Sequence, residues 1–402
     1  MTSPIEEELI NTENKHSLLE NEVRNLPMLA ASIFKKGDQI APADFKETKI
    51  SLGNCSLPSF KETFPTLLKE QSAVLDAVKS LGNPIINKRV AVLFSGGPAS
   101  GGHNVVLGIK AVLGDDNVLY GVKGGPKGLL NGDLFEITNE ELNKVKNLGG
   151  FDFLGSDRTK IKTKEQFEKV REVVKQYHLN GLIVVGGDDS NTNAAFLAEY
   201  LYPDGCAVVG VPKTIDGDLQ IGALLPISFG FDTATKIYAE LVGNILQDTP
   251  SSRKYWHFIK LMGRSASHVA LEVALQTKPA ITFISEEIEE EKFTLKEIID
   301  KLVRTILERA SKGINHGVIL VPEGLIEFIP DLKDLIKELD VLFGEDSELD
   351  KLDLMQKVDI VRERLKPETA KVFHFLPLEI KKMLGVDRDA HGNLQVSKIS
   401  TE

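Results

Sequence analysis

A repeated pairing of a short apolar segment with a glycine-rich or charged turn most constrains the fold. Six segments have the length and the branched side chains of buried strands: Arg89–Phe94, Leu182–Val185, Ala207–Val211, His257–Leu261, Ala280–Ile284 and Gly317–Val321. Amphipathic stretches lie between them, as in Glu165–Leu179, where Phe167, Val170 and Val174 recur at helical spacing. Apolar strands that alternate with amphipathic helices predict a mostly parallel α/β sheet.

The turns after several of these strands carry glycines and charges. They are Ser95–Asn104 (SGGPASGGHN), Gly186–Ser190 (GGDDS), Pro212–Asp218 (PKTIDGD), Met262–Arg264 (MGR) and Pro322–Gly324 (PEG). In sheets of this kind, ligands bind beyond the carboxyl ends of the strands. The repeated position of the turns therefore predicts that they line a binding site.

The first turn has the composition of an anion-binding loop. Gly96 and Gly97 allow the backbone to approach a ligand closely and to direct N–H groups at one anion. The turn lacks the GK[ST] ending of a Walker A loop and the GxGxxG spacing of a dinucleotide-binding loop. An ordinary strand-to-helix turn is the alternative interpretation.

The second and third turns carry groups suited to phosphoryl transfer. Asp188 and Asp189 are adjacent carboxylates, which suit Mg²⁺, although helix capping is an alternative role. Lys213 can neutralise a moving phosphoryl group, and Asp216 can take a proton from an attacking hydroxyl. A polar loop with an Asp-Gly turn is the alternative here. In the last two turns, Arg264 could bind a sugar or a phosphate, and Glu323 could accept hydrogen bonds from sugar hydroxyls. A helix cap or a surface charge is the alternative role of each.

Bulk features exclude several classes of protein. The chain has 48 Lys+Arg against 59 Asp+Glu, which argues against a nucleic-acid binder with a generally basic surface. No apolar run approaches the ~18–20 residues that span a bilayer, and the acidic N-terminus is not a secretory signal. Two cysteines, Cys55 and Cys206, and eight scattered histidines predict neither a disulfide framework nor a zinc site. We therefore expect a cytoplasmic protein without membrane partners.

The length of 402 residues predicts two or three domains. Two helical patterns, near Ile5–Arg24 and near Phe64–Leu81, predict a helical N-terminal extension. The stretch after Gly324 is rich in Leu, Asp, Glu and Lys, which predicts a helical insertion with solvated charged faces. The expected domains are an extension (1–84), a first α/β domain (85–250) and a second α/β domain (251–402) with the insertion at about 330–382.

Taken in order, the turns resemble the motifs of the phosphofructokinase family. The series is GG at Gly96, LGSDR ending at Arg158, then GGDD, PKTIDGD, MGR and PEG. Where ATP-using members resemble GGDG and PGTIDND, this chain has Asp189 and Lys213, as in the pyrophosphate-dependent branch. The resemblance implies two Rossmann-like, mostly parallel sheet domains, of which the first (85–250) would bind pyrophosphate and Mg²⁺ and the second (251–402) the sugar phosphate. It also implies that Asp189 crowds the space that the rest of ATP would occupy and repels the nucleotide there, because a carboxylate is larger and more negative than glycine.

The resemblance further implies a reaction and a site. The reaction is the reversible transfer of a phosphoryl group from pyrophosphate to the 1-hydroxyl of fructose 6-phosphate in glycolysis, with Mg²⁺. Asp216 would be the base, and Lys213 would supply charge near the transferred phosphate. The remaining implied roles fall to Thr214 and Asp218 in the base's loop; Asp188 for Mg²⁺; Gly96, Gly97 and Arg158 for pyrophosphate; and Met262, Gly263, Arg264 and Glu323 for the sugar phosphate.

One departure from the family leaves alternatives open. The segments Gly324–Pro330 and His391–Ile399 resemble the long subgroup of this branch, whose members continue past the point where this chain stops. The resemblance therefore implies an incomplete second domain and a C-terminally truncated chain. The alternatives are a non-catalytic regulatory or inactive member and an ATP-dependent 6-phosphofructokinase, which Asp189 and Lys213 disfavour. The family also implies a homodimer or a higher assembly.

Overall fold

A computed structural model of the chain describes residues 17–27, 30–37, 39–49, 58–70, 73–78, 85–219, 225, 228–345 and 354–386. The chain forms two compact units, one ending at Lys213 and the other beginning at Thr214. This boundary precedes the expected one after residue 250. The reason is that helix α10 (Phe231–Ser252) packs through Val242 and Leu246 into the core of the second unit.

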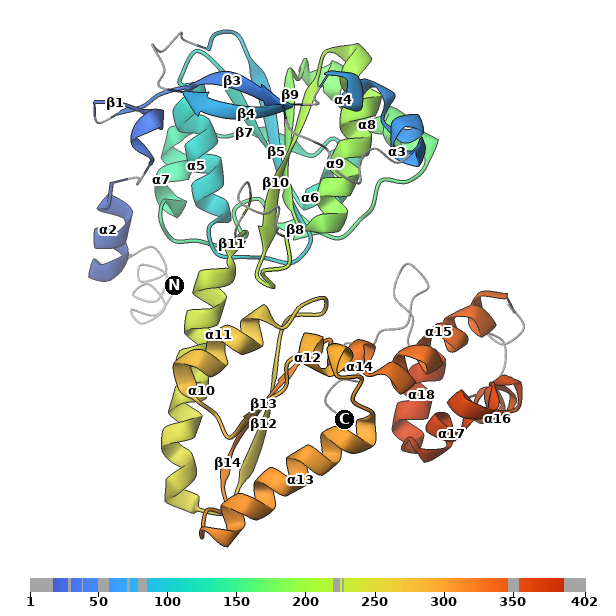
Figure 1. Ribbon diagram of the computed structural model, residues 1–402. Coiled ribbons are helices and arrows are strands. Elements are labelled where there is room, and N and C mark those ends of the chain that lie inside the picture. Colours follow the sequence, from blue (N-terminus) through green and yellow to red (C-terminus); the bar gives the residue numbers. More distant parts are fainter. Residues whose placement is uncertain are drawn as a thin grey trace, which may run out of the picture. The chain divides into compact units, whose positions relative to one another are not determined.

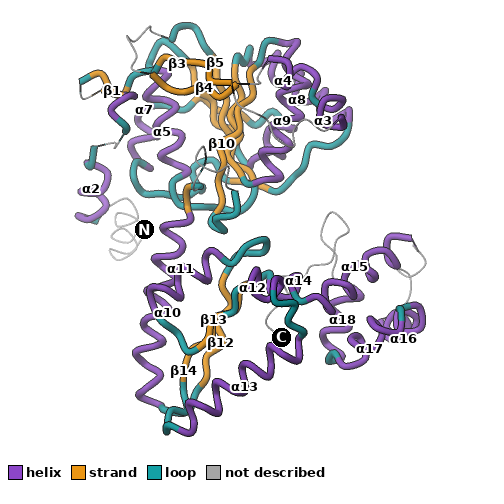
Figure 2. Tube along the Cα trace, in the orientation of Figure 1, coloured by secondary structure: helices purple, strands orange, loops and turns teal. Residues whose placement is uncertain are grey.

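The first unit is built on a sheet with the strand order β10–β9–β5–β6–β7, and the short strand β8 also pairs with β5. Neighbouring strands are parallel except β6 and β7. The strands are β5 (Arg89–Ser95), β6 (Val118–Val122), β7 (Leu134–Glu136), β8 (Ser156–Asp157), β9 (Gly181–Gly186) and β10 (Ala207–Thr214). The three strands predicted in this part of the chain are confirmed and lie side by side (Figure 2).

Helices cover both faces of this sheet, with α6, α8 and α9 on one face and α5 and α7 on the other (Figure 1). Val170 of α8 and Leu197 of α9 pack on Leu93 and Leu182 of the sheet. The helices are α5 (Gly102–Leu113), α6 (Gly125–Asn131), α7 (Asn139–Val145), α8 (Lys164–Tyr177) and α9 (Asp188–Leu201), followed by the 3₁₀ turn η3 (Tyr202–Asp204). Helix α8 confirms the prediction for Glu165–Leu179.

The segment before β5 contains strands as well as helices. The helix predicted at Ile5–Arg24 appears as α2, and residues 1–16 lie outside the described residues. The helix predicted at Phe64–Leu81 is wrong over Ala73–Val78, because β4 pairs antiparallel with β3 there and such tertiary pairing overrides local spacing. The elements are α2 (Leu18–Asn25), η1 (Ser32–Phe34), β1 (Lys35–Lys36), β2 (Gln39–Ile40), β3 (Asp44–Lys49), α3 (Pro58–Thr63), α4 (Pro65–Glu70) and β4 (Ala73–Val78).

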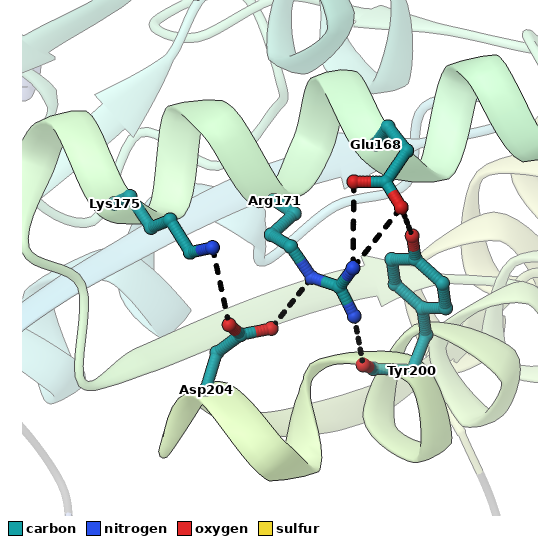
Figure 3. A network of polar contacts seen from close by, with 5 residues as sticks. All are labelled: Glu168, Arg171, Lys175, Tyr200 and Asp204. Atoms are coloured by element: carbon teal, nitrogen blue, oxygen red, sulfur yellow. Dashed lines mark hydrogen bonds and ion pairs between the residues drawn. The ribbon is translucent and has the colours of Figure 1, made fainter.

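A charged network joins α8 to the end of α9 (Figure 3). Arg171 donates to Asp204 at 2.8 Å, to Glu168 at 3.0 Å and to the carbonyl of Tyr200 at 3.3 Å. Its guanidinium carbon lies 4.1 Å from the centre of the Tyr200 ring, and Lys175 reaches Asp204 at 3.6 Å. The hydrogen bond from the Tyr200 hydroxyl lowers the pKa of Glu168, so this carboxylate loses its charge only in acid.

We expect Arg171→Met to lower the free energy of unfolding by about 1–2 kcal/mol, after allowance for solvent screening. The physical reason is that the guanidinium satisfies two carboxylates and a carbonyl with only 24% of its side chain exposed. Urea unfolding measures the change. Lys175→Met is the control, because this lysine is 64% exposed and makes one longer contact. Equal losses of unfolding free energy in both variants would contradict a special stabilising role of Arg171.

The second unit has a three-stranded parallel sheet with the order β12–β14–β13. Its strands confirm the last three predicted segments, although β13 covers only two of the five residues predicted at Ala280–Ile284. Helices α10 and α11 pack on this sheet through Val242, Val269 and Leu261. The elements are β11 (Phe229–Gly230), β12 (Trp256–Leu261), α11 (His268–Thr277), β13 (Ile281–Thr282), α12 (Ser285–Glu290), α13 (Leu295–Ser311), β14 (Gly317–Pro322) and α14 (Leu325–Phe328).

The stretch predicted to be a helical insertion is helical. Its apolar side chains, including Leu335, Val361 and Phe373, extend the core beneath Ile319 of β14. The helices are α15 (Pro330–Glu345), α16 (Leu354–Arg364), α17 (Pro367–Phe375) and α18 (Leu378–Val386). Among the residues that the structure describes, no helix is long and apolar enough to span a membrane. Burial raises the pKa of the Cys206 thiol to about 11, and Cys55 lies outside the described residues.

Candidate active site

The glycine loop follows β5 and is tied to its neighbours by backbone geometry. Gly96 has a φ of 85°, which favours glycine, and its N–H donates to the carbonyl of Asp157 at 2.9 Å. A Cβ atom added at Gly97 would lie 3.5 Å from Nη2 of Arg158. The loop and Arg158 meet because β8, which precedes Arg158, pairs with β5. The structure therefore brings together the three residues predicted to bind pyrophosphate from these two motifs.

Asp157 stands in the family motif directly before Arg158. Its carboxylate accepts from the backbone N–H of Lys127 at 3.1 Å and from the hydroxyl of Thr159 at 2.5 Å. The negative charge of Asp157 is thus engaged at the start of α6, while the guanidinium of Arg158 is exposed beside the glycine loop. This leaves the loop with a net positive neighbour suited to an anion.

Lys213 brings a buried cation to the same loop. It is the last residue but one of β10 and is only 6% exposed, and its Nζ donates to the carbonyl oxygen of Gly97 at 2.7 Å. The ammonium also lies 5.8 Å from the centre of the Phe151 ring, which faces it favourably. A cation at this loop favours the binding of an anion such as a phosphate. The glycine loop, Arg158 and Lys213 are therefore brought together by β5, β8 and β10.

The two aspartates of the GGDD motif occupy the first turn of α9. Asp188 and Asp189 are both exposed there, where the helix dipole favours negative charge. Asp189 is paired with Lys160, whose Nζ lies 3.0 Å from Oδ1 of the carboxylate. The hydroxyl of Ser190 donates to that of Ser95 at 2.8 Å and so ties this turn to the start of the glycine loop. Sequence reasoning missed Lys160, which no local sequence pattern distinguishes from a surface lysine.

Asp188 suits a magnesium ion that also binds water and substrate better than a metal held by protein side chains alone. Its carboxylate is exposed, and among the described residues no group of three His, Cys, Asp or Glu side chains could hold a metal. Mg²⁺ keeps several waters and commonly takes one or two carboxylates together with substrate phosphates. One exposed carboxylate beside the glycine loop suits this combination of magnesium ligands.

The predicted base lies in the second unit, on the loop Thr214–Asp218. The N–H of Asp216 donates to the hydroxyl of Thr214 at 3.1 Å, which bends the loop tightly. Gly217 has a φ of 73°, and a Cβ there would lie 2.9 Å from the Phe231 ring, so only glycine fits. His268 contacts the Gly217 carbonyl at 2.9 Å through Nδ1. Asp218 is exposed on the same loop.

The MGR and PEG motifs meet because β12 and β14 are neighbours. The N–H of Glu323 donates to the carbonyl of Leu261 at 2.8 Å, and that of Gly324 to the carbonyl of Gly263 at 3.1 Å. A Cβ on Gly324 would lie 1.9 Å from the carbonyl oxygen of Arg264, which requires glycine there. Met262 and Arg264 are exposed on this double loop.

Sequence reasoning missed Tyr238, which lies on α10. Burial raises the pKa of its phenol, and the charges of Asp216 and Glu323 raise it further. Desolvation likewise raises the pKa of Glu327, while the charge of Arg264 opposes the shift. The charges of the predicted base and of the PEG motif therefore both act on Tyr238.

Comparison with known proteins agrees with these motifs. The phosphofructokinase family model matches residues 89–358. The chain is 51% identical over 321 residues to a pyrophosphate--fructose 6-phosphate 1-phosphotransferase of Entamoeba histolytica, covering 78% of this chain and 59% of that protein. A beta 2 subunit of the same name from Arabidopsis thaliana is 47% identical over 350 residues, covering 85% of this chain and 60% of that protein. The chain thus spans about three fifths of the length of these relatives.

The fold agrees with solved structures at lower similarity. The phosphofructokinase of Saccharomyces cerevisiae superimposes with a TM-score of 0.51 at 20% identity, over 62% of this chain and 34% of that chain. This likeness concerns the fold, which the strand order and the covering helices already define. With the matched family model, the ordered motifs and relatives at about half identity, the chain belongs to the phosphofructokinase family.

Proposed function

We propose that the chain transfers a phosphoryl group from pyrophosphate to the 1-hydroxyl of fructose 6-phosphate, giving fructose 1,6-bisphosphate and phosphate. The names of the relatives support this donor and this acceptor. The observation that carries the proposal is Lys213, a buried ammonium that donates to the glycine loop at Gly97. In the motif of ATP-using members a glycine stands at this position, whereas transfer from pyrophosphate would use the positive charge of Lys213.

The donor residues bind and orient pyrophosphate. The glycine loop allows close approach of the backbone, and Arg158 offers a planar guanidinium for phosphate oxygens. Lys213 stabilises the charge that develops on the phosphate as the bond to the transferred group breaks. Asp188 would hold Mg²⁺, which supplies charge neutralisation on the phosphate oxygens when it is bound.

The acceptor residues hold the sugar phosphate and move one proton. Arg264 and Glu323 come from adjoining loops, so that one recognises the phosphate and the other the sugar hydroxyls. Asp216 takes the proton of the 1-hydroxyl while that oxygen bonds to phosphorus, and phosphate leaves. Thr214 and Gly217 fix the backbone of the base. This is positioning and electrostatic catalysis without a covalent intermediate.

A coupled assay tests the proposal directly. Product formation by the 402-residue chain with Mg²⁺ and fructose 6-phosphate is expected with pyrophosphate and absent with ATP. Activity with ATP alone would establish the ATP-dependent alternative. Activity with neither donor, combined with retained binding of fructose 6-phosphate, would establish the non-catalytic alternative. The homodimer expected from the resemblance stays a prediction.

We expect Asp189→Gly to make ATP a detectable phosphoryl donor. The substitution removes a carboxylate from the first turn of α9 and leaves the Lys160 ammonium, 3.0 Å away, for an additional phosphate. The ratio of kcat/KM for ATP to that for pyrophosphate measures the change. Asp116→Gly, at an exposed aspartate between α5 and β6, is the matched control. Continued exclusion of ATP in a folded variant would show that Asp189 does not select the donor.

A further inference from the structure

The N-terminal helix α2 is joined by hydrogen bonds to the first turn of α5, which follows the glycine loop. Nδ2 of Asn147 donates to the carbonyl of Val23 at 3.0 Å and to that of Leu26 at 3.1 Å, both at the end of α2. Oδ1 of Asn147 accepts from Nδ2 of Asn104 at 3.2 Å, and the Asn147 N–H donates to Oδ1 of Asn104 at 3.1 Å. One asparagine thus bridges two helices that are far apart in the sequence.

The backbone of Asn147 makes this bridge possible. Its φ of 59° is left-handed, a conformation that asparagine tolerates better than most residues, and it directs the side chain at α2. The last carbonyls of a helix lack the regular intrahelical donor. The Val23 carbonyl accepts from the N–H of Leu26 at 3.3 Å, and the amide of Asn147 adds a second donor there and a donor at the Leu26 carbonyl. The bridge therefore fixes the end of α2 at a defined point.

The segment that begins at Asn147 continues to the donor site. A Cβ added at Gly102, in the first turn of α5, would lie 2.7 Å from the carbonyl oxygen of Gly150 and 2.5 Å from the Phe151 ring. The Phe151 ring stacks on Phe94 with 4.1 Å between centroids, and the Lys213 ammonium lies 5.8 Å from its centre. A shift of this segment would thus move both the α5 turn and the surroundings of Lys213.

We propose that Asn147 is a positioning residue, which uses α2 to hold the first turn of α5, and hence the glycine loop, in the geometry that binds pyrophosphate. It acts through Asn104, to which it is hydrogen-bonded, and through Phe151 of its own segment, whose ring lies against Gly102. The N-terminal segment is then a part of the donor site's support. The kinetic test of this inference rests on the proposed function, whereas the exchange test described below does not.

Two substitutions in the complete chain cut the bridge from opposite sides. Glu22→Pro unwinds α2 at an exposed position in its middle, and Glu22→Ala is the matched control that keeps the helix. Asn147→Asp retains the acceptor for Asn104 but loses the donor to Val23 and Leu26. His178→Asp is its control, because His178 is also left-handed, with a φ of 52°, and ends α8.

We expect Glu22→Pro and Asn147→Asp each to raise KM for pyrophosphate about fivefold, the factor that corresponds to one net hydrogen bond. Because saturating pyrophosphate can still occupy the glycine loop, kcat is expected to stay unchanged. The double variant should raise KM no further, since both substitutions cut the same link. Amide hydrogen exchange of residues 101–106 should be faster in both variants than in the two controls.

Either of two results would overturn the inference. One is a KM and an exchange rate at residues 101–106 that equal those of the controls in both variants. The other is an additive effect in the double variant, which would show two independent perturbations. If the unsubstituted chain is inactive with pyrophosphate, the proposed function fails. The exchange rates at residues 101–106 then decide about the bridge alone.

Discussion

Replacing Asp216 with asparagine is expected to lower kcat by about 10³-fold, with little change in the affinity for fructose 6-phosphate. The amide keeps the size of the side chain and can remain on the loop that Thr214 and Gly217 hold. It cannot take up the proton of the sugar hydroxyl. Steady-state kinetics with pyrophosphate, together with calorimetric binding of fructose 6-phosphate, measures both effects.

Asp232→Asn is the control for this prediction. Asp232 lies in the first turn of α10, pairs with Lys236 and is far more exposed than Asp216. The control variant should keep the kcat of the unsubstituted chain. A loss of less than tenfold in Asp216→Asn would show that another group takes the proton. A loss of sugar phosphate binding would assign Asp216 to the binding of the acceptor.

Lys213→Met is expected to lower kcat/KM for pyrophosphate by about 10²–10³-fold. Methionine fills a similar volume at this buried position but brings no charge and no donor to the carbonyl of Gly97. Both the ground-state phosphate and the charge that develops on it are then less stabilised, so KM should rise and kcat should fall. Steady-state kinetics at varied pyrophosphate separates the two parameters.

Lys144→Met provides the matched control, because Lys144 is 62% exposed on α7 and pairs with Glu140 at the surface. Its kinetics should equal those of the unsubstituted chain. Thermal unfolding of Lys213→Met checks that the fold persists despite the lost hydrogen bond at Gly97. If a folded Lys213→Met variant retains the kcat/KM of the control, Lys213 is not the donor-side cation.

The two sheets were predictable where their strands are largely buried. Segments such as Leu182–Val185 and Gly317–Val321 are continuous apolar runs, and they became β9 and β14. Short or partly exposed elements were less predictable. The pattern of Phe64–Leu81 indicated one helix, whereas β4 forms there by pairing with the distant strand β3. Spacing along the chain carries no information about such a partner.

The candidate site was predictable where motifs follow strands. Gly96 directly follows β5, and Lys213 lies near the end of β10 in the same sheet, so their proximity follows from the topology. Lys160, Tyr238 and Asn147 were not predictable in this way. Each acts through a partner on another element, such as Asp189 for Lys160, and no local pattern distinguishes it from a surface residue.

The sequence by itself determined the α/β class, the order of the motifs and the residue types of the donor and acceptor loops. These depend on local composition, since burial demands apolar runs and phosphate binding demands glycine and cations near strand ends. Only the tertiary structure decided where the two units divide, that the Asp157 carboxylate accepts from the N–H of Lys127 at the start of α6, and that α2 is bridged to α5 by Asn147. Those features depend on contacts between residues far apart in the chain, whose geometry exists only after the sheet and its helices have packed.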